Sequence, residues 1–251
     1  MSLKVIVFIY FINNYLISHK KNIIILSICS GQARDILPAI AGREDKDRIT
    51  TYLLDIDKDC LEYAQEYARI HDIPNVHTIN KDASLKESYD DIPKADLIVI
   101  CGLFGHLVPE DIATTALFLQ TLIEDNATVI WSRNKFFNDH SDNIRNIFNQ
   151  LSYKEIDFID EHMFFVGVSS SPKKEFLLPD KLFNFIDYQK MFKPPCANTV
   201  FSLDFIELLK EVNGFPKNIG IAVIKKQKVN ENTSDKAELV ICKLMINYFV
   251  F

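Results

Sequence analysis

The sequence predicts an α/β fold, a mostly parallel sheet with helices on both faces that closes with a C-terminal antiparallel hairpin. Three observations predict it. Apolar runs of strand length alternate with helical segments between residues 22 and 151. Two strand-like segments, residues 153–159 and 163–168, then follow each other with only three residues between them. The chain has 251 residues, 48% of them hydrophobic, which is enough to bury such a core.

Five segments are expected to form the parallel strands. The run NIIILSIC at residues 22–29 is apolar throughout and rich in β-branched residues, which is typical of a strand buried on both faces. The other four are residues 49–56, 75–80, 95–101 and 127–131.

Helices are expected between these strands. Gly31 makes the turn after the first strand, and Pro38 must either lie in the first turns of the short helix that follows or bend it. Asp57 is a suitable cap for the next helix. Pro109 opens another as a first-turn proline, and residues 142–151 form the last.

The final two strands cannot be parallel neighbours. Residues 160–162 are too few for a parallel crossover, so residues 153–159 and 163–168 must form an antiparallel hairpin. A parallel sheet closed in this way is the architecture of class I methyltransferases. Ordinary dinucleotide-binding folds stay parallel at this point.

The chain divides into residues 22–186 as the core domain, residues 1–21 as an N-terminal extension and residues 187–251 as a C-terminal extension with no assigned role. The run VIVFIYFI at residues 5–12 is too short to span a bilayer and has no cleavage site after it. We expect a buried strand or helix there rather than a signal or anchor, and therefore a cytoplasmic protein without a membrane partner.

The net charge and the cysteine spacing argue against nucleic-acid-binding and zinc-binding proteins. A net charge of −6 does not favour nucleic acid as a partner. None of the five cysteines lies in a C-x-x-C pair, so we expect reduced thiols and no metal site. The oligomeric state is left open.

A ligand site is expected where the carboxyl ends of the parallel strands meet. Four consecutive strand ends carry suitable residues in chain order. They are Ser30, Gly31 and Gln32 after the first strand, Asp55 and Ile56 after the second, Asp82 and Ala83 after the third, and Cys101 and Gly102 after the fourth.

These residue types match S-adenosylmethionine, which carries a ribose, an adenine and an amino acid but no phosphate. Gly31 lets the backbone approach the methionyl part, and Asp55 can accept hydrogen bonds from both ribose hydroxyls. Asp82 can accept from the adenine amine, and carbonyls near Gly102 can hold the ammonium group. Taken singly, Gly31 could be a turn glycine, Asp55 a helix cap and Asp82 a surface carboxylate. Their joint order favours the cofactor.

The glycine pattern argues against phosphate-containing cofactors. A dinucleotide fingerprint needs G-x-G-x-x-G, whereas the stretch CSGQARD holds only Gly31. The sequence also has no P-loop motif.

The segments ILSICSGQARDIL, LLDIDKDCLEYAQEYA, NKDAS, ADLIVICGLFGHL and ATVIWSRN together resemble a group of largely uncharacterised bacterial class I methyltransferases. The resemblance covers about two-thirds of the chain. It implies that Gly31, Asp55, Asp82 and Gly102 contact S-adenosylmethionine. The chain departs from the family pattern where Ser27 replaces the usual acidic residue, and where Cys29 and Ala33 replace two glycines.

Methyl transfer depends on alignment, and it needs a base only if the acceptor carries a proton. The candidate base is His106, in the loop after the fourth strand, although a histidine that hydrogen-bonds locally near a helix start is the simpler interpretation. Arg133 and Asn134 could orient an acceptor.

Three functions are consistent with the sequence. The first is methyl transfer from S-adenosylmethionine to an unidentified small-molecule acceptor. The second is a methyltransferase fold that binds without catalysis, and the third is a nicotinamide-dependent oxidoreductase, which the single glycine and the hairpin disfavour.

Overall fold

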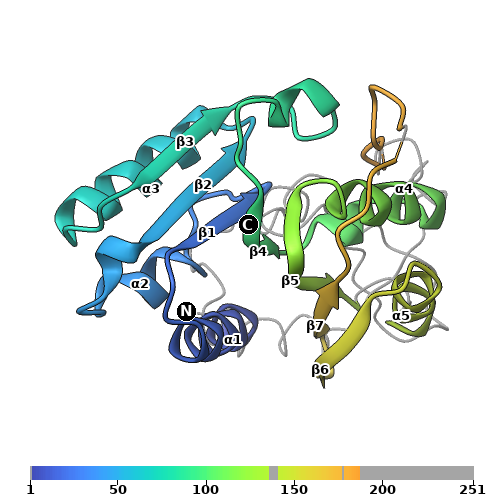
Figure 1. Ribbon diagram of the computed structural model, residues 1–251, viewed down its shortest axis with the longest axis horizontal. Helices are drawn as coiled ribbons and strands as arrows, with labels where there is room; N and C mark the ends of the chain where they lie inside the picture. The colour runs from blue at the N-terminus through green and yellow to red at the C-terminus, as the bar shows by residue number, and fades with distance from the viewer. Residues whose placement is uncertain (1, 136–140, 177, 187–251) are drawn as a thin grey trace, which may run out of the picture. The chain divides into compact units, whose positions relative to one another are not determined.

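The computed structural model describes residues 2–135, 141–176 and 178–186 (Figure 1). The predicted C-terminal extension, residues 187–251, lies outside the described residues. In the described part, seven strands form one sheet in the order β3-β2-β1-β4-β5-β7-β6. They are β1 (Ile23–Ile28), β2 (Ile49–Asp55), β3 (Val76–Asn80), β4 (Ala95–Ile100), β5 (Ile123–Asn134), β6 (Lys154–Asp160) and β7 (Phe164–Ser171).

Five α-helices surround the sheet in the described part, with short 3-10 helices in the connections. The α-helices are α1 (Leu3–Ser18), α2 (Leu37–Ala41), α3 (Lys58–Ile70), α4 (Pro109–Leu119) and α5 (Ser141–Gln150). The 3-10 helices are η1 (Lys46–Arg48), η2 (Lys86–Tyr89) and η3 (Leu103–His106). Pro38 and Pro109 both lie at the starts of their helices, as their missing N–H groups require.

The predicted fold class is confirmed. β1 to β5 pair in parallel, and β7 runs antiparallel between β5 and β6. The strand order changes direction between β1 and β4, which are neighbours at the centre of the sheet (Figure 1). In sheets of this kind, ligands bind beyond the carboxyl ends of the strands at that point.

One strand is longer than the sequence predicts. β5 begins at Ile123 and ends at Asn134, whereas only residues 127–131 have strand-like character. The polar end, Ser132 to Asn134, is extended because β7 pairs with it as far as Phe164. The start contains a register shift against β4 and a left-handed residue, Asn126, which the apolar pattern could not reveal.

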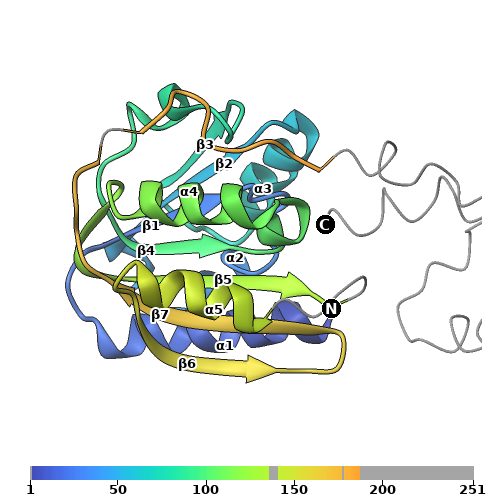
Figure 2. The ribbon, with the colours of Figure 1, turned by 90° about the vertical axis from the view of Figure 1, so that its right-hand side faces the viewer.

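Buried side chains form one cluster on each face of the sheet. On one face, Phe8 of α1, Ile40 of α2 and Leu61 of α3 belong to the same cluster as the sheet residues Ile25 and Val99. On the other face, helices α4 and α5 supply the apolar side chains, and Figure 2 shows them in front of the strands. The sheet is therefore covered on both sides, as continuous apolar strands require.

The N-terminal apolar run forms α1, which packs on the sheet. Phe8, Ile12 and Leu16 are fully buried, and the Tyr15 hydroxyl donates a 2.9 Å hydrogen bond to the Asp96 carbonyl at the start of β4. α1 runs alongside β7, and its N-terminal end lies at the same edge of the sheet as the arrowheads of β4 and β5 (Figure 2). Within the described residues, no helix is both long and apolar enough to cross a membrane.

Candidate functional site

The loop after β1 has an unusual backbone. Cys29, Gly31 and Ala33 have φ angles of 54°, 51° and 51°, all in the left-handed region that glycine tolerates best. Cys29 and Ala33, which stand where the sequence resemblance leads one to expect glycines, therefore keep a glycine-like conformation. Ala33 is 1% exposed and belongs to the buried cluster with α1 and α2, so its methyl group packs in the core instead of crowding a ligand.

The ends of β1 and β2 are joined by a hydrogen bond. The Gly31 N–H donates to Asp55 Oδ2 at 2.7 Å, and the Asp57 N–H donates to Asp55 Oδ1 at 2.9 Å. A carboxylate has about four lone-pair sites, so two remain for a ligand. The helix cap is Asp57, which accepts from the N–H groups of Asp59 and Cys60 at 2.9 and 3.1 Å. Asp55 is therefore not needed as the cap.

The end of β3 lies against the end of β2. Asn80 Nδ2 donates to the Ile56 carbonyl at 2.8 Å, and the Ile56 side chain is 70% exposed at this edge. Asp82 Oδ1 accepts from the Ser84 N–H at 2.8 Å. The Ala83 carbonyl accepts from a tyrosine hydroxyl, so the turn is tied down on both sides.

The ends of β1, β2 and β3 also interact electrostatically. Burial raises the pKa of the Cys29 thiol, and the negative charges of Asp55 and Asp82 raise it further. Both carboxylates therefore act on the loop after β1. Ser30 Oγ in this loop is buried and has no hydrogen-bond partner among the described residues.

The end of β4 continues the site. Gly102 has a φ of 93°, which turns the chain from β4 into η3. Burial raises the pKa of the adjacent Cys101 to about 12. The predicted cofactor residues therefore all lie at the carboxyl ends of β1 to β4, although their contacts with a cofactor stay predictions.

Two residues that the strand-end pattern does not include also lie here. Asp35 is 5% exposed, and burial raises its pKa to about 6. Hydrogen bonds from the backbone N–H groups of Asp35 and Ile36 and the positive charge of Lys4 oppose this rise. Lys4 Nζ lies 3.6 Å from the position that a Cβ on Gly102 would occupy. Asp35 lies in the segment ILSICSGQARDIL, so the sequence resemblance could have pointed to it. Lys4 is a single cation in an apolar run, and no sequence pattern connects it with a strand end.

His106 is partly buried at the end of η3. Burial lowers its pKa, and the positive charges of Lys4 and Arg133 lower it further. The imidazole is therefore neutral at pH 7, as a general base must be. Arg133 also supports the loop, because its Nη1 donates a 2.9 Å hydrogen bond to the Phe104 carbonyl.

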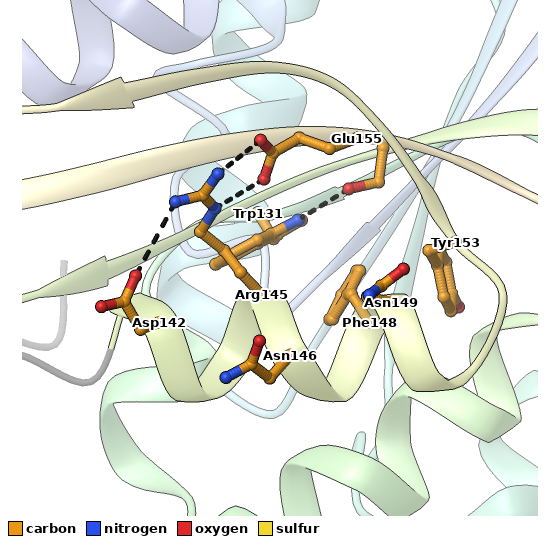
Figure 3. Close-up of a pocket in the computed structure, with 9 residues that line it drawn as sticks. Trp131, Asp142, Arg145, Asn146, Phe148, Asn149, Tyr153 and Glu155 are labelled. Atoms are coloured by element: carbon orange, nitrogen blue, oxygen red, sulfur yellow. Dashed lines mark hydrogen bonds and ion pairs between the residues drawn. The ribbon is translucent and has the colours of Figure 1, made fainter.

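A cavity of about 440 Å³ lies away from these strand ends, between α5 and the antiparallel part of the sheet (Figure 3). Arg145 reaches across it to Glu155 with two hydrogen bonds of 2.7 Å, and Trp131 forms part of its wall. A second cavity of about 430 Å³ touches the site, since Asp82 lines it. In the described part of the chain, no group of three or more histidine, cysteine or carboxylate side chains is placed to hold a metal ion.

Several solved structures are similar to this chain. A precorrin-6y C5,15-methyltransferase from Geobacter metallireducens matches 65% of this chain and 88% of its own, with a TM-score of 0.51 and 11% identity. A ribosomal protein L11 methylase from Lactobacillus delbrueckii subsp. bulgaricus matches 69% and 81%, with a TM-score of 0.51 and 16% identity. A magnesium protoporphyrin IX methyltransferase from Synechocystis, with bound S-adenosylmethionine, matches 65% and 77%, with a TM-score of 0.50 and 13% identity.

No protein-family model matches the sequence, and no curated protein matches it either. At identities of 11–16%, the structural matches show the fold and not the activity. The chain has the Rossmann-like fold of class I methyltransferases.

Proposed function

We propose that this chain, which has the class I methyltransferase fold, transfers a methyl group from S-adenosylmethionine to a small-molecule acceptor. The hydrogen bond from the Gly31 N–H to Asp55 Oδ2, at 2.7 Å, carries the proposal. It fixes the loop after β1 against a carboxylate that still has lone pairs for two ribose hydroxyls.

Other residues at the strand ends fit the same ligand. Ser30 Oγ is buried without a partner among the described residues, so a polar ligand group there would complete its hydrogen bonding. The left-handed Gly102 has no side chain to fill the space at the end of β4. Asp82 lies on the far side of Asp55, where an adenine attached to the ribose would extend.

When bound, S-adenosylmethionine supplies a methyl group carried on a positively charged sulfur. The chain's own residues would then hold and orient the two reactants. In well-oriented intramolecular reactions, such alignment gives the reacting groups an effective concentration of about 10⁵–10⁸ M. His106 is placed to take a proton from an acceptor, because it is neutral at pH 7 and lies beyond the expected cofactor contacts.

The proposal is tested first by binding. Calorimetric titration of the purified full chain with S-adenosylmethionine, S-adenosylhomocysteine and NAD should show binding of the first two only. Binding of NAD alone would indicate the oxidoreductase instead.

Catalysis needs a second experiment. Incubation with methyl-labelled S-adenosylmethionine and a small-molecule extract should transfer label to an extract component. Cofactor binding without any label transfer, over extracts that support a known methyltransferase, would favour a non-catalytic binding protein.

A further inference from the structure

The first turn of α1 reaches the candidate site. α1 is held along the sheet by its buried side chains and by the hydrogen bond from Tyr15 to the start of β4. Because the opposite end of α1 lies at the carboxyl edge of the sheet (Figure 2), Lys4 extends over the end of β4. Its Nζ is 3.6 Å from the Cβ position of Gly102.

The Lys4 ammonium has three segments of the site around it. Its positive charge lowers the pKa values of Asp35, Cys101 and His106. These residues belong to the loop after β1, the end of β4 and η3. The ammonium therefore faces the place where those segments converge.

Lys4 is partly buried, and in the part of the chain that the structure describes it makes no hydrogen bond and no ion pair. The nearby Asp35 carboxyl acts on it only through space. A partly buried ammonium in this position would be stabilised by an anionic ligand that enters the site.

We propose that Lys4 binds the carboxylate of the cofactor's methionyl group and so positions the cofactor for transfer. This rests on the proposed function. In an α-amino acid the carboxylate and the ammonium group share one carbon atom. A ligand whose ammonium group is held by carbonyl oxygens near Gly102 would therefore bring its carboxylate within reach of the Lys4 ammonium. Among the described residues, leaving out the chain neighbours of Gly102, Lys4 Nζ is the one atom within 4 Å of its Cβ position, so a ligand that reaches Gly102 would meet the lysine.

The experiment compares two ligands that differ in the amino acid part. S-adenosylhomocysteine carries the carboxylate, whereas 5′-methylthioadenosine lacks it. On the full chain, Lys4→Met should weaken S-adenosylhomocysteine by about 10- to 100-fold and change methylthioadenosine by less than about twofold. Lys4→Arg should recover part of the lost affinity, because it restores the charge.

Lys20→Met is the matched control, since Lys20 lies after the end of α1, is exposed and carries the same charge. Unchanged S-adenosylhomocysteine affinity in Lys4→Met would overturn the inference, and so would an equal loss for both ligands, which would mean that α1 had moved. If the unaltered protein bound neither nucleoside, the proposed function itself would fail, and this inference with it.

Discussion

Gly31 and Asp55 are joined by a 2.7 Å hydrogen bond between a backbone N–H and a carboxylate oxygen. The loop after β1 is thereby held in its left-handed conformation from the neighbouring strand, independently of any ligand. A site whose backbone is already in place loses less conformational entropy when a ligand binds.

Asp55→Ala should reduce affinity for S-adenosylhomocysteine by at least about 100-fold, because two charge-assisted hydrogen bonds to the ribose are lost. Calorimetry on a variant shown to be folded by circular dichroism measures this. Asp57→Ala is the control, since it removes the α3 cap at a cost of about 1 kcal/mol but no expected ligand contact. Equal affinity losses in the two variants would show that Asp55 acts through loop stability alone.

His106→Ala should lower turnover by about 10²–10⁴-fold on an acceptor that carries a proton. The pKa of His106 is lowered, so the wild-type rate should rise with pH through a value below the ordinary pKa of about 6.5 and then stay level. Affinity for S-adenosylhomocysteine should not change. His162→Ala, in the exposed hairpin turn, serves as the control. A loss of cofactor affinity in His106→Ala would assign His106 to the cofactor pocket.

Asp35→Asn should stabilise the protein at neutral pH relative to wild type. The folded-state pKa of Asp35 is raised to about 6, so its contribution to stability is complete below the unfolded value near 4 and is lost as pH rises through 6. The difference in unfolding free energy between variant and wild type should therefore grow by up to about 3 kcal/mol between pH 4 and 7.5. Urea titrations at both pH values measure it.

Asp45→Asn provides a control of opposite sign. Hydrogen bonds and ion pairs with Arg43 and Arg48 hold the pKa of Asp45 well below its usual range. Its contribution is therefore present at neutral pH and is lost in acid. A difference for Asp35→Asn that did not change with pH would contradict the burial of a charged carboxylate at that position.

Gly167→Ala should destabilise the fold by about 1–3 kcal/mol, or prevent folding, because overpacking a tight core is costly. An added Cβ would lie 2.4 Å from the Trp131 indole carbons, and Trp131 is 1% exposed. Thermal unfolding checks this, with Gly42→Ala as the control, since a Cβ there meets no atom within 4 Å. A smaller side chain in the double variant Gly167→Ala with Trp131→Phe should recover part of the loss.

The sheet was predictable because its strands are continuous apolar runs and because the last two are too close together for a crossover. The ends of β5 were not predictable from apolarity, since Ser132 to Asn134 are extended by pairing with β7. Pairing between distant strands leaves no trace in a local pattern.

The positions of the strand-end residues were predictable to the same degree, whereas their role as ligand contacts stays a prediction. Asp55, Asp82 and Gly102 follow their strands directly, so reading strand ends is sufficient to find them. Lys4 reaches Gly102 from a helix about 100 residues earlier in the chain, and only the packing of that helix brings the two together.

In the loop after β1, a left-handed backbone occurs at residues other than glycine, although left-handed backbone and glycine usually occur together. Cys29 and Ala33 keep a shape that glycine adopts more cheaply, at about 1–2 kcal/mol for each side chain. A ligand at such a loop would contact backbone atoms, including the N–H groups, and these have the same positions whichever side chain the residue carries. Proteins with a loop of this shape can therefore differ in their glycines while presenting the same backbone surface, and their φ angles will show the likeness where their sequences do not.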